Sequence, residues 1–513
     1  MTIRVLLLLA FFAVMLIIGF VYRRNSSSVN GFILGGRNVG PWVTAFAYGT
    51  SYFSAVIFVG YAGQFGWKYG IAASWIGIGN ALIGSLLAWK ILGRRTRIMS
   101  QQLESATMPQ FFAARFGGES LKIASALITF VFLIPYTASL YNGLSRLFGM
   151  AFDIDYSVCV IAMAVLTGIY VIAGGYMAAA INDFIQGIIM IVGIVAVIVS
   201  VLNGQGGFMA AIDRLAQVSD AGVSTSPGVF ASFFGPDPLS LLGVVILTSL
   251  GTWGLPQMVQ KFYAIQSEKA IEKGTIVSTF FAFVVAGGCY FLGGFGRLFS
   301  DRVNVAVEGY DSIVPAMLSG LSGTLIAVVV VLVLSASMST LSSLVLTSSS
   351  TLTLDLLKGH VIKDPDEKQQ LFLMRFLIVV FVAISVVIAI IQYKRNVSFI
   401  AQLMGVSWGA LAGAFLAPFL YGLYWKGTSA AGVWCNFIFS TVVMILNMAI
   451  RPDFPPLLQS PINAGAFCML AGFVIVPAVS FFTKKPDRSR IDAAFACYDR
   501  EVTVHQIRSL SDL

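Results

Sequence analysis

The sequence predicts an all-α polytopic membrane protein, and three observations support that fold class. Hydrophobic residues make up 58% of the 513-residue chain and charged residues only 11%, whereas a soluble domain has about 25% charged residues. Apolar stretches of the length that crosses a bilayer recur from one end of the chain to the other. Lysine and arginine gather in alternate loops between these stretches. The polar stretches are only loop-sized, so nothing indicates a soluble domain.

A window of about 20 residues gives about thirteen candidate transmembrane helices. They lie near residues 3–22, 42–63, 71–92, 120–148, 156–176, 180–202, 239–262, 273–297, 313–346, 372–392, 398–422, 429–449 and 463–482. We expect the first to be retained rather than cleaved as a signal peptide. Arg23 and Arg24 follow it instead of preceding it, and it lacks a small-residue cleavage site.

The basic residues predict how these helices are oriented in the membrane. Alternate loops contain Arg23 and Arg24; Arg94, Arg95, Arg97 and Arg115; Lys261, Lys269 and Lys273; Lys358, Lys363 and Lys368; and finally Lys484 and Lys485. The intervening loop 203–238 has a single basic residue, Arg214, although Lys394 and Arg395 are an exception to the pattern. Because basic loops stay in the cytoplasm, we expect the N-terminus outside, the C-terminus inside, and a multi-pass protein of the cytoplasmic membrane.

Two of the predicted helices are interrupted in the middle by glycine, proline and hydroxyl residues. The second helix contains Gly49–Ser54, and the seventh contains Thr248–Pro256. Carbonyl groups freed by such breaks are tolerated at membrane depth only against protein or a wet cavity. Interruptions at matching positions of two halves indicate a transporter site built from inverted repeats. Ordinary kinks are the alternative, because glycine and proline are frequent in membrane helices.

The interruptions divide the chain into segments. These are an N-terminal extra helix and cytoplasmic loop (1–40), a first inverted repeat (41–203), an extracellular loop (204–238), a second inverted repeat (239–422), two C-terminal extra helices (423–483) and a cytoplasmic tail (484–513). We expect a short amphipathic surface helix at Gly207–Val218 and another short helix in the tail around Ile491–Tyr498.

The helix predicted at 313–346 turns rich in hydroxyl groups toward its end. More than half of the residues from Leu334 to Thr353 are serine or threonine. Helical periodicity places Ala336, Ser339, Thr340, Ser343 and Thr347 near one face. That face offers oxygens without a charge, which suits a small hard cation such as sodium. The alternative is packing, since membrane serines and threonines commonly bond to their own helix or let helices approach closely.

Asp183 is a lone acid near the start of the helix predicted at 180–202. A carboxylate within a membrane span is costly and is therefore a functional candidate. A solvated helix N-terminus is the alternative. If Asp183 faces the hydroxyl-rich helix, it supplies a negative charge for a cation.

Four short motifs, in this order, resemble signatures of the sodium/solute symporter family. They are Phe32–Arg37 followed by Gly40–Pro41; Gly174–Gly175 with Asn182, Asp183 and Gln186; Trp253–Gln257; and Met338–Ser343. The resemblance covers about residues 1–480, and about thirteen helices match the bacterial members. It implies a LeuT-type fold with 5+5 inverted repeats, in which sodium influx drives the uptake of an organic solute.

The resemblance also implies which residues bind sodium. The main site would use the backbone carbonyls of Thr50 and Phe53, the carbonyl of Ala336, and the hydroxyls of Ser339 and Thr340. Five oxygens without formal charge suit a monovalent ion that must leave again. Some family members resemble this chain in a second cluster, here Asp183, Ser342 and Ser343, which permits a second sodium ion.

The solute is expected between the two interruptions. By resemblance, the residues that line or gate it are Ser54, Tyr136, Ser249, Thr252 and Trp253. Bacterial proline symporters of the family carry an acid at the position of Tyr52 and aromatics at Thr248 and Thr252, whereas Tyr136 matches their pattern. We therefore expect a small organic solute, either an amino acid such as proline or a small carboxylate.

Sodium-coupled secondary active symport by alternating access is the expected function. Two alternatives stay open, a proton-coupled symporter and a membrane sensor that signals through the tail 487–513. An enzyme is not expected, because the spans hold no paired carboxylates, histidine cluster or Ser/His pair. The scattered cysteines and histidines show no metal-ligand spacing, so sodium is the only metal expected. The net charge of +9 reflects the loops rather than nucleic-acid binding, and no obligate protein partner is evident.

Overall fold

The structure is a computed structural model that describes residues 2–152, 155–224, 226–395 and 400–498. The regular secondary structure of the described residues consists of helices, with a few isolated β-bridges. In this part of the chain ten helical stretches are long and apolar enough to cross a membrane, or eleven if the bent pair α11 (Pro238–Gly254) and α12 (Pro256–Ala264) forms one span. An all-helical multi-pass membrane fold is therefore confirmed, while the count of thirteen and the orientation stay predictions.

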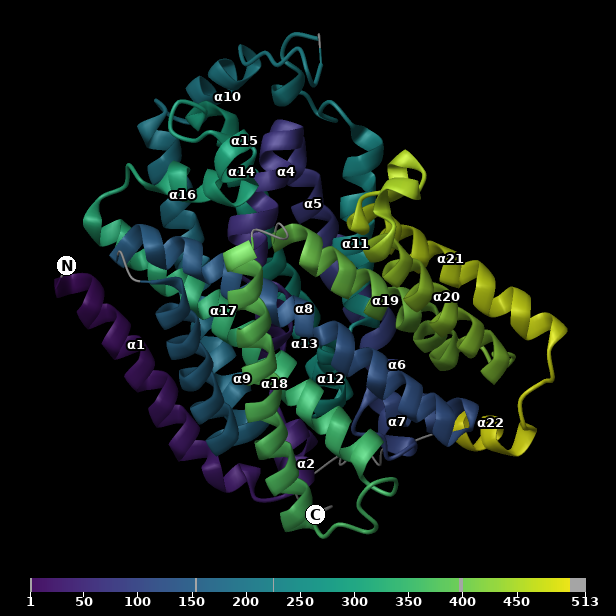
Figure 1. Cartoon of the computed structure of the whole chain (residues 1–513). Coiled ribbons are helices and arrows are strands. Elements are labelled where there is room, and N and C mark those ends of the chain that lie inside the picture. Colours follow the sequence, from purple (N-terminus) through teal and green to yellow (C-terminus); the bar gives the residue numbers. More distant parts are fainter. Residues whose placement is uncertain (1, 153–154, 225, 396–399, 499–513) are drawn as a thin grey trace, which may run out of the picture.

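The chain contains both long helices and short ones (Figure 1). The first half contains α1 (Thr2–Val21), α2 (Val29–Leu34), α3 (Pro41–Tyr52), α4 (Ala62–Tyr69), α5 (Ser74–Gly79), α6 (Arg94–Gln102), α7 (Met108–Phe116), α8 (Glu119–Phe152), α9 (Tyr156–Gly204) and α10 (Phe208–Ala216). After α11 and α12 follow α13 (Glu268–Ala282), α14 (Gly288–Gly293), α15 (Val305–Glu308), α16 (Ile313–Leu318), α17 (Gly323–Thr351), α18 (Glu367–Arg395), α19 (Ile400–Tyr424), α20 (Ala430–Ala449), α21 (Pro461–Phe482) and α22 (Arg488–Phe495). Figure 1 shows α1 on one side of the molecule and α20 and α21 on the opposite side.

Two expected short helices are confirmed outside the long ones. The predicted surface helix at Gly207–Val218 is α10, which exposes Phe208 and Met209. The predicted tail helix is α22, continued by a 3₁₀ turn at Ala496–Tyr498.

The helix α9 accounts for part of the difference between thirteen predicted spans and the observed count. It has 49 residues, so a straight helix of that length would be roughly 70 Å long, more than twice the thickness of a bilayer core. Its backbone leaves helical geometry at Gly175 (φ 58°, ψ −149°), a conformation that glycine adopts readily. The predicted helices 156–176 and 180–202 therefore lie in one element with a break between them.

Helix α17 lies at the centre of the bundle. It packs against α9, α8, α18 and α3, and all its residues from Leu332 to Thr351 are buried. A membrane helix that is buried on every side has no lipid face, so its serine and threonine hydroxyls must find partners inside the protein. The positions of those partners define the candidate site.

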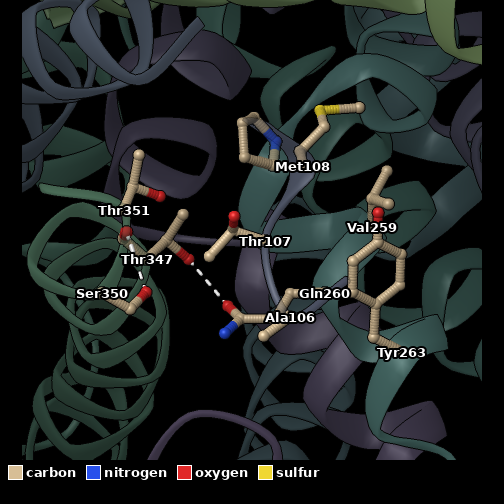
Figure 2. Close-up of a pocket in the computed structure, with 10 residues that line it drawn as sticks. Ala106, Thr107, Met108, Val259, Gln260, Tyr263, Thr347, Ser350 and Thr351 are labelled. Atoms are coloured by element: carbon tan, nitrogen blue, oxygen red, sulfur yellow. Dashed lines mark hydrogen bonds between the residues drawn. The ribbon is translucent and has the colours of Figure 1, made fainter. Parts of the chain in front are cut away.

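The later part of α17 contacts α12 through polar side chains (Figure 2). Thr347 Oγ1 donates a hydrogen bond to Gln260 Oε1 at 2.9 Å. A cavity of about 10 Å³ lies beside this contact, with Thr107, Ser350 and Thr351 also in its wall. That volume is close to the smallest that holds one water molecule, so the two helices are nearly sealed here.

Candidate functional site

At the first interruption the helical conformation ends, and the chain continues through an extended residue before a new helical segment begins. Helix α3 ends at Tyr52, Phe53 is extended (φ −85°, ψ 116°), and a π-helical turn follows at Val56–Tyr61. Carbonyl groups in the last turn of a helix have no amide partner one turn further on. Thr50 and Phe53 are both fully buried, so their carbonyl oxygens point into the protein interior without access to bulk water.

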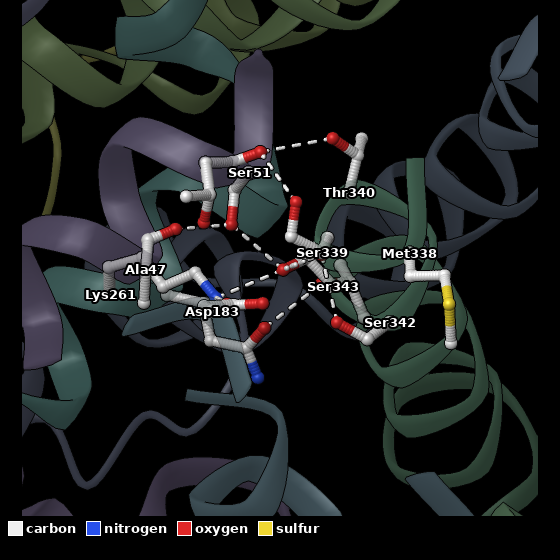
Figure 3. Close-up of polar contacts among 12 residues, drawn as sticks. Ala47, Ser51, Asp183, Lys261, Met338, Ser339, Thr340, Ser342 and Ser343 are labelled. Atoms are coloured by element: carbon white, nitrogen blue, oxygen red, sulfur yellow. Dashed lines mark hydrogen bonds and ion pairs between the residues drawn. The ribbon is translucent and has the colours of Figure 1, made fainter. Parts of the chain in front are cut away.

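Hydroxyl groups of α17 lie against these carbonyls (Figure 3). Ser339 Oγ is 3.2 Å from the carbonyl oxygen of Thr50 and 3.2 Å from that of Ala336. Thr340 Oγ1 is 3.1 Å from Thr50 O, 3.3 Å from Phe53 O and 3.1 Å from Ala336 O. The structure therefore brings together all five oxygens that the sequence predicts for the main sodium site.

These contacts outnumber the protons available to make them. Ser339 makes two oxygen contacts and Thr340 makes three, but each hydroxyl carries a single proton. Even if each proton is shared between two acceptors, at least one contact brings two electron-rich oxygens together with no proton between them. A small cation among the five oxygens would convert this repulsion into coordination, which is chemistry that oxygen donors offer to hard cations.

The second cluster predicted for sodium is arranged differently. Asp183 is completely buried, which excludes the alternative of a solvated helix N-terminus. Ser342 Oγ donates to the carbonyl of Ser339 in its own helix at 2.8 Å. Ser343 Oγ lies 2.8 Å from Ser51 Oγ of α3 and accepts a hydrogen bond from Lys261 Nζ at 3.0 Å. Asp183 and Ser343 therefore meet through the ammonium of Lys261, which is 3.8 Å from Asp183 Oδ2.

Lys261 is a residue whose role the sequence interpretation missed. The basic pattern places it in a cytoplasmic loop, but it lies within α12 and its side chain is only 2% exposed. The bend before α12 accounts for this buried position. Leu255 is extended, and the helix begins again at Pro256 at an angle of 46° to α11. A lone buried acid requires a partner of opposite charge, and that requirement was the signal that could have identified Lys261.

The second interruption carries three of the residues predicted for the solute. Ser249, Thr252 and Trp253 lie at the end of α11, and all three bond to the π-helical stretch Asn80–Leu87. Ser249 Oγ donates to Asn80 Oδ1 at 3.2 Å, Thr252 Oγ1 to Gly84 O at 3.0 Å, and Trp253 Nε1 to Ile83 O at 3.0 Å. These bonds fix the broken helix against its neighbour.

The other two predicted solute residues lie by the first break. Ser54 Oγ accepts a hydrogen bond from the amide of Val56 at 3.2 Å and so helps to start the π-helical turn. Tyr136 of α8 packs edge to face against Trp408 of α19, with ring centroids 5.9 Å apart. A Cβ atom on Gly251 in the second break would lie 2.8 Å from the Trp408 ring. Trp408, which the sequence interpretation did not select, therefore connects the two breaks.

Buried polar side chains with poorly made hydrogen bonds lie around this connection. Tyr136 Oη interacts with Ser54 and Trp408, and Tyr290 with Asn80, but Tyr136 Oη, Trp408 Nε1 and Asn80 Nδ2 make no hydrogen bond of good geometry with the described residues. Nearly all buried polar groups in proteins are well paired, so a bound molecule is one explanation for groups that are not. The hydroxyl, the indole N–H and the amide are donors that a polar solute could accept from.

The chain matches the model of the Sodium:solute symporter family over residues 32–439. A Sodium/proline symporter from Staphylococcus aureus is 29% identical over 500 residues, which cover 94% of this chain and 93% of that protein. The Sodium/proline symporter of Staphylococcus aureus strain JH9 is 30% identical over 501 residues, with the same coverage.

The arrangement of helices in this chain is similar to that of a solved structure. It is the substrate-bound outward-open state of a Na⁺-coupled sialic acid symporter, described as revealing a novel Na⁺-site. The TM-score is 0.70 with 17% sequence identity, and the alignment covers 95% of this chain and 99% of that chain. At this identity the likeness concerns the fold, which is that of LeuT-fold-like transporters.

Proposed function

Because this chain belongs to the sodium:solute symporter family, we propose that it is a sodium-coupled symporter that imports a small amino acid, with proline the first candidate, or a small carboxylate. As a family member it is a transporter and not an enzyme. One observation carries the proposal, namely the five uncharged oxygens that meet where α3 breaks against α17. The cytoplasmic membrane is the proposed location.

The geometry suggests how sodium binding is coupled to solute binding. Sodium bound by Thr50, Phe53, Ala336, Ser339 and Thr340 would hold the broken end of α3 against α17. Ser54 directly follows the ligand Phe53, so the position of the break also sets one wall of the solute pocket. A ligand shifts a conformational equilibrium only through different affinities for the two states. Sodium must therefore bind the outward-open state better than the inward-open state, and rocking of one bundle against the other then releases both.

The proposed solute follows from the relatives and from the polar groups near the two breaks. The relatives named above are sodium/proline symporters. The polar groups of Trp408, Asn80 and Tyr136 make no hydrogen bond of good geometry within the described part of the protein and offer neutral donors to a carboxylate. Tyr52 and Thr252 differ from the pattern of bacterial proline symporters, so a different small amino acid or a small carboxylate is the second choice.

Uptake into proteoliposomes tests the proposal. Purified protein is reconstituted, and uptake of radiolabelled proline is measured with an inward sodium gradient, with potassium replacing sodium, and with a proton gradient alone. We expect accumulation only with the sodium gradient. Accumulation that follows the proton gradient and ignores sodium would contradict sodium coupling.

A thermal-stability screen identifies the solute if proline is not transported. Small amino acids and carboxylates are added to the purified protein in sodium and in potassium buffer. A ligand that binds only the folded state raises its stability. The transported solute is expected to raise Tm in sodium and much less in potassium.

A further inference from the structure

The ammonium group of Lys261 lies in the cluster that, by resemblance, would permit a second sodium ion. It donates to Ser343 Oγ at 3.0 Å and is 3.8 Å from Asp183 Oδ2, so it lies between two of the three predicted ligands. The face of the Tyr176 ring is 5.0 Å away, which adds a cation–π contact. A single positive charge therefore already sits in this cluster, supplied by the protein itself.

The contact between Lys261 and Asp183 is not that of a well-made buried salt bridge. Buried ion pairs are stable when their geometry is excellent and additional hydrogen bonds satisfy the remaining atoms. Here the nitrogen–oxygen distance is 3.8 Å, and neither carboxylate oxygen of Asp183 receives a hydrogen bond from the described residues. The carboxylate thus keeps coordination capacity that a closer cation would use.

The cluster is linked directly to the main site. Ser343, which binds the ammonium, also contacts Ser51 of α3 at 2.8 Å. Ser51 is the neighbour of Thr50, whose carbonyl is one of the five oxygens of the main site. Lys261 belongs to α12, the second part of one broken helix. It is therefore linked to α3, the other broken helix, through the single side chain of Ser343 (Figure 3).

We propose that the Lys261 ammonium takes the place of a second sodium ion, so that this carrier couples one sodium ion to each solute. The inference rests on the proposed sodium symport. It predicts a specific change in sodium binding for a variant that lacks the ammonium. Such a variant retains Asp183, Ser342 and Ser343 around an uncompensated charge, and a free sodium ion fills the vacated position.

The test measures how many sodium ions bind to purified wild-type protein and to Lys261→Met. Tm is recorded against sodium concentration without solute, because the slope at high concentration reports the number of ions that bind the folded state. Sodium-driven uptake in proteoliposomes gives the Hill coefficient independently. We expect about one ion for the wild type and about two for Lys261→Met. The exposed Lys269→Met serves as control and should behave as the wild type.

A second pair of variants identifies the origin of the added ion. Lys261→Met combined with Asp183→Asn removes both charges and is expected to bind one ion again. Asp183→Asn alone covers the case in which Lys261→Met does not fold. That variant should keep the wild-type count, whereas a fall from two ions to one would show that sodium already occupies the cluster.

The outcomes separate this inference from the proposed function. A wild type that binds two ions, or a folded Lys261→Met that binds no additional ion, overturns the role of Lys261 and leaves sodium symport standing. Absence of any sodium effect in every variant overturns sodium symport itself.

Discussion

Ser339 and Thr340 differ from the serines at the end of α17 in where their hydrogen bonds go. Both reach across to the broken end of α3. Ser349 and Ser350 instead donate to carbonyls of their own helix, at Leu346 and Thr347. The packing interpretation of membrane hydroxyls thus describes the end of the run, and the ion interpretation fits only the residues beside the break.

Removing the two hydroxyls is expected to weaken sodium binding selectively. In Ser339→Ala with Thr340→Ala, the site keeps three carbonyls and loses two ligands. The sodium concentration for half-maximal uptake should rise at least tenfold, about 1.4 kcal/mol, and saturable sodium dependence should disappear from the measurable range. Ser349→Ala removes a hydroxyl of the same helix and should leave the sodium response unchanged. An unaltered response in the double variant would reject this site.

The indole of Trp408 gives a prediction for the solute. Trp408→Phe keeps an aromatic ring against Tyr136 but removes the indole N–H, which makes no hydrogen bond of good geometry with the described residues. One hydrogen bond contributes about 0.5–1.5 kcal/mol, so KM for the solute should rise roughly two- to tenfold with the sodium response retained. Trp75→Phe is the control, because Trp75 bonds to the Phe233 carbonyl at the surface. An unchanged KM for Trp408→Phe would place the solute elsewhere.

Residues differed in how far the sequence could identify them. Ser339 and Thr340 could be predicted because family-like motifs and a helix break both point to them. Lys261 could not, because a lysine near the end of an apolar stretch resembles a loop residue until the bend after Leu255 is known. Trp408 could not, because a single aromatic in an apolar helix is most simply explained by packing.

Among the elements, α4 and α14 approach more closely than side chains would allow. A Cβ atom on Gly66 would lie 1.9 Å from the carbonyl oxygen of Gly293, and one on Gly293 would lie 2.1 Å from that of Ala62. Small residues allow this close backbone approach between membrane helices. The contact sits next to the π-helical turn that follows the break in α3.

Gly66→Ala is therefore expected to destabilise the fold. The added methyl group meets backbone, which cannot move aside as a flexible side chain can, and overpacking costs about 1–3 kcal/mol or more. Gly168→Ala in α9 is the matched control, because a Cβ atom there has no neighbour within 4 Å. Thermal unfolding in detergent should show a lower Tm for Gly66→Ala only. Equal Tm values for the two variants would contradict the close contact.

The elements themselves were predictable to different degrees. Both interrupted helices could be located, since glycine and proline mark breaks directly in the sequence. The continuity of α9 through Gly175 could not, because an apolar run on each side of two glycines is equally consistent with a loop. The hydrogen bonds from Ser249, Thr252 and Trp253 to the stretch Asn80–Leu87 join elements far apart in the sequence and leave no periodic signal in it.

At the scale of the whole molecule, the described part of the tail, which ends at Tyr498, is folded back onto the bundle; residues 499–513 lie outside the described residues. The guanidinium of Arg95 lies between the rings of Tyr424 and Tyr498, at 4.1 and 4.5 Å, and Tyr498 Oη donates to the Arg95 carbonyl at 3.1 Å. Nearby, Arg115 donates to Gly422 O at 2.9 Å and lies 5.0 Å from the Phe495 ring. Burial lowers the pKa of Arg115 to about 10, so it stays charged at neutral pH.

Deleting residues 487–513 separates a transporter from a sensor. The deletion removes a short segment that packs on the bundle mainly through Phe495 and Tyr498, so it should lower Tm by a few degrees, consistent with a loss of about 1–2 kcal/mol. Sodium-driven uptake in proteoliposomes should persist. Tyr498→Ala should reproduce part of the fall in Tm. Complete loss of uptake by folded, truncated protein would instead indicate that the tail is required for function.

The candidate sodium site has a consequence for how such carriers diversify. Three of its five oxygens belong to the peptide backbone at Thr50, Phe53 and Ala336, and almost any amino acid provides the same carbonyl. The chemistry of ion binding therefore constrains the identity of only two side chains, Ser339 and Thr340. Neighbouring positions can therefore be substituted in ways that change the solute while the coupling ion stays the same, so ion binding and solute specificity can evolve independently.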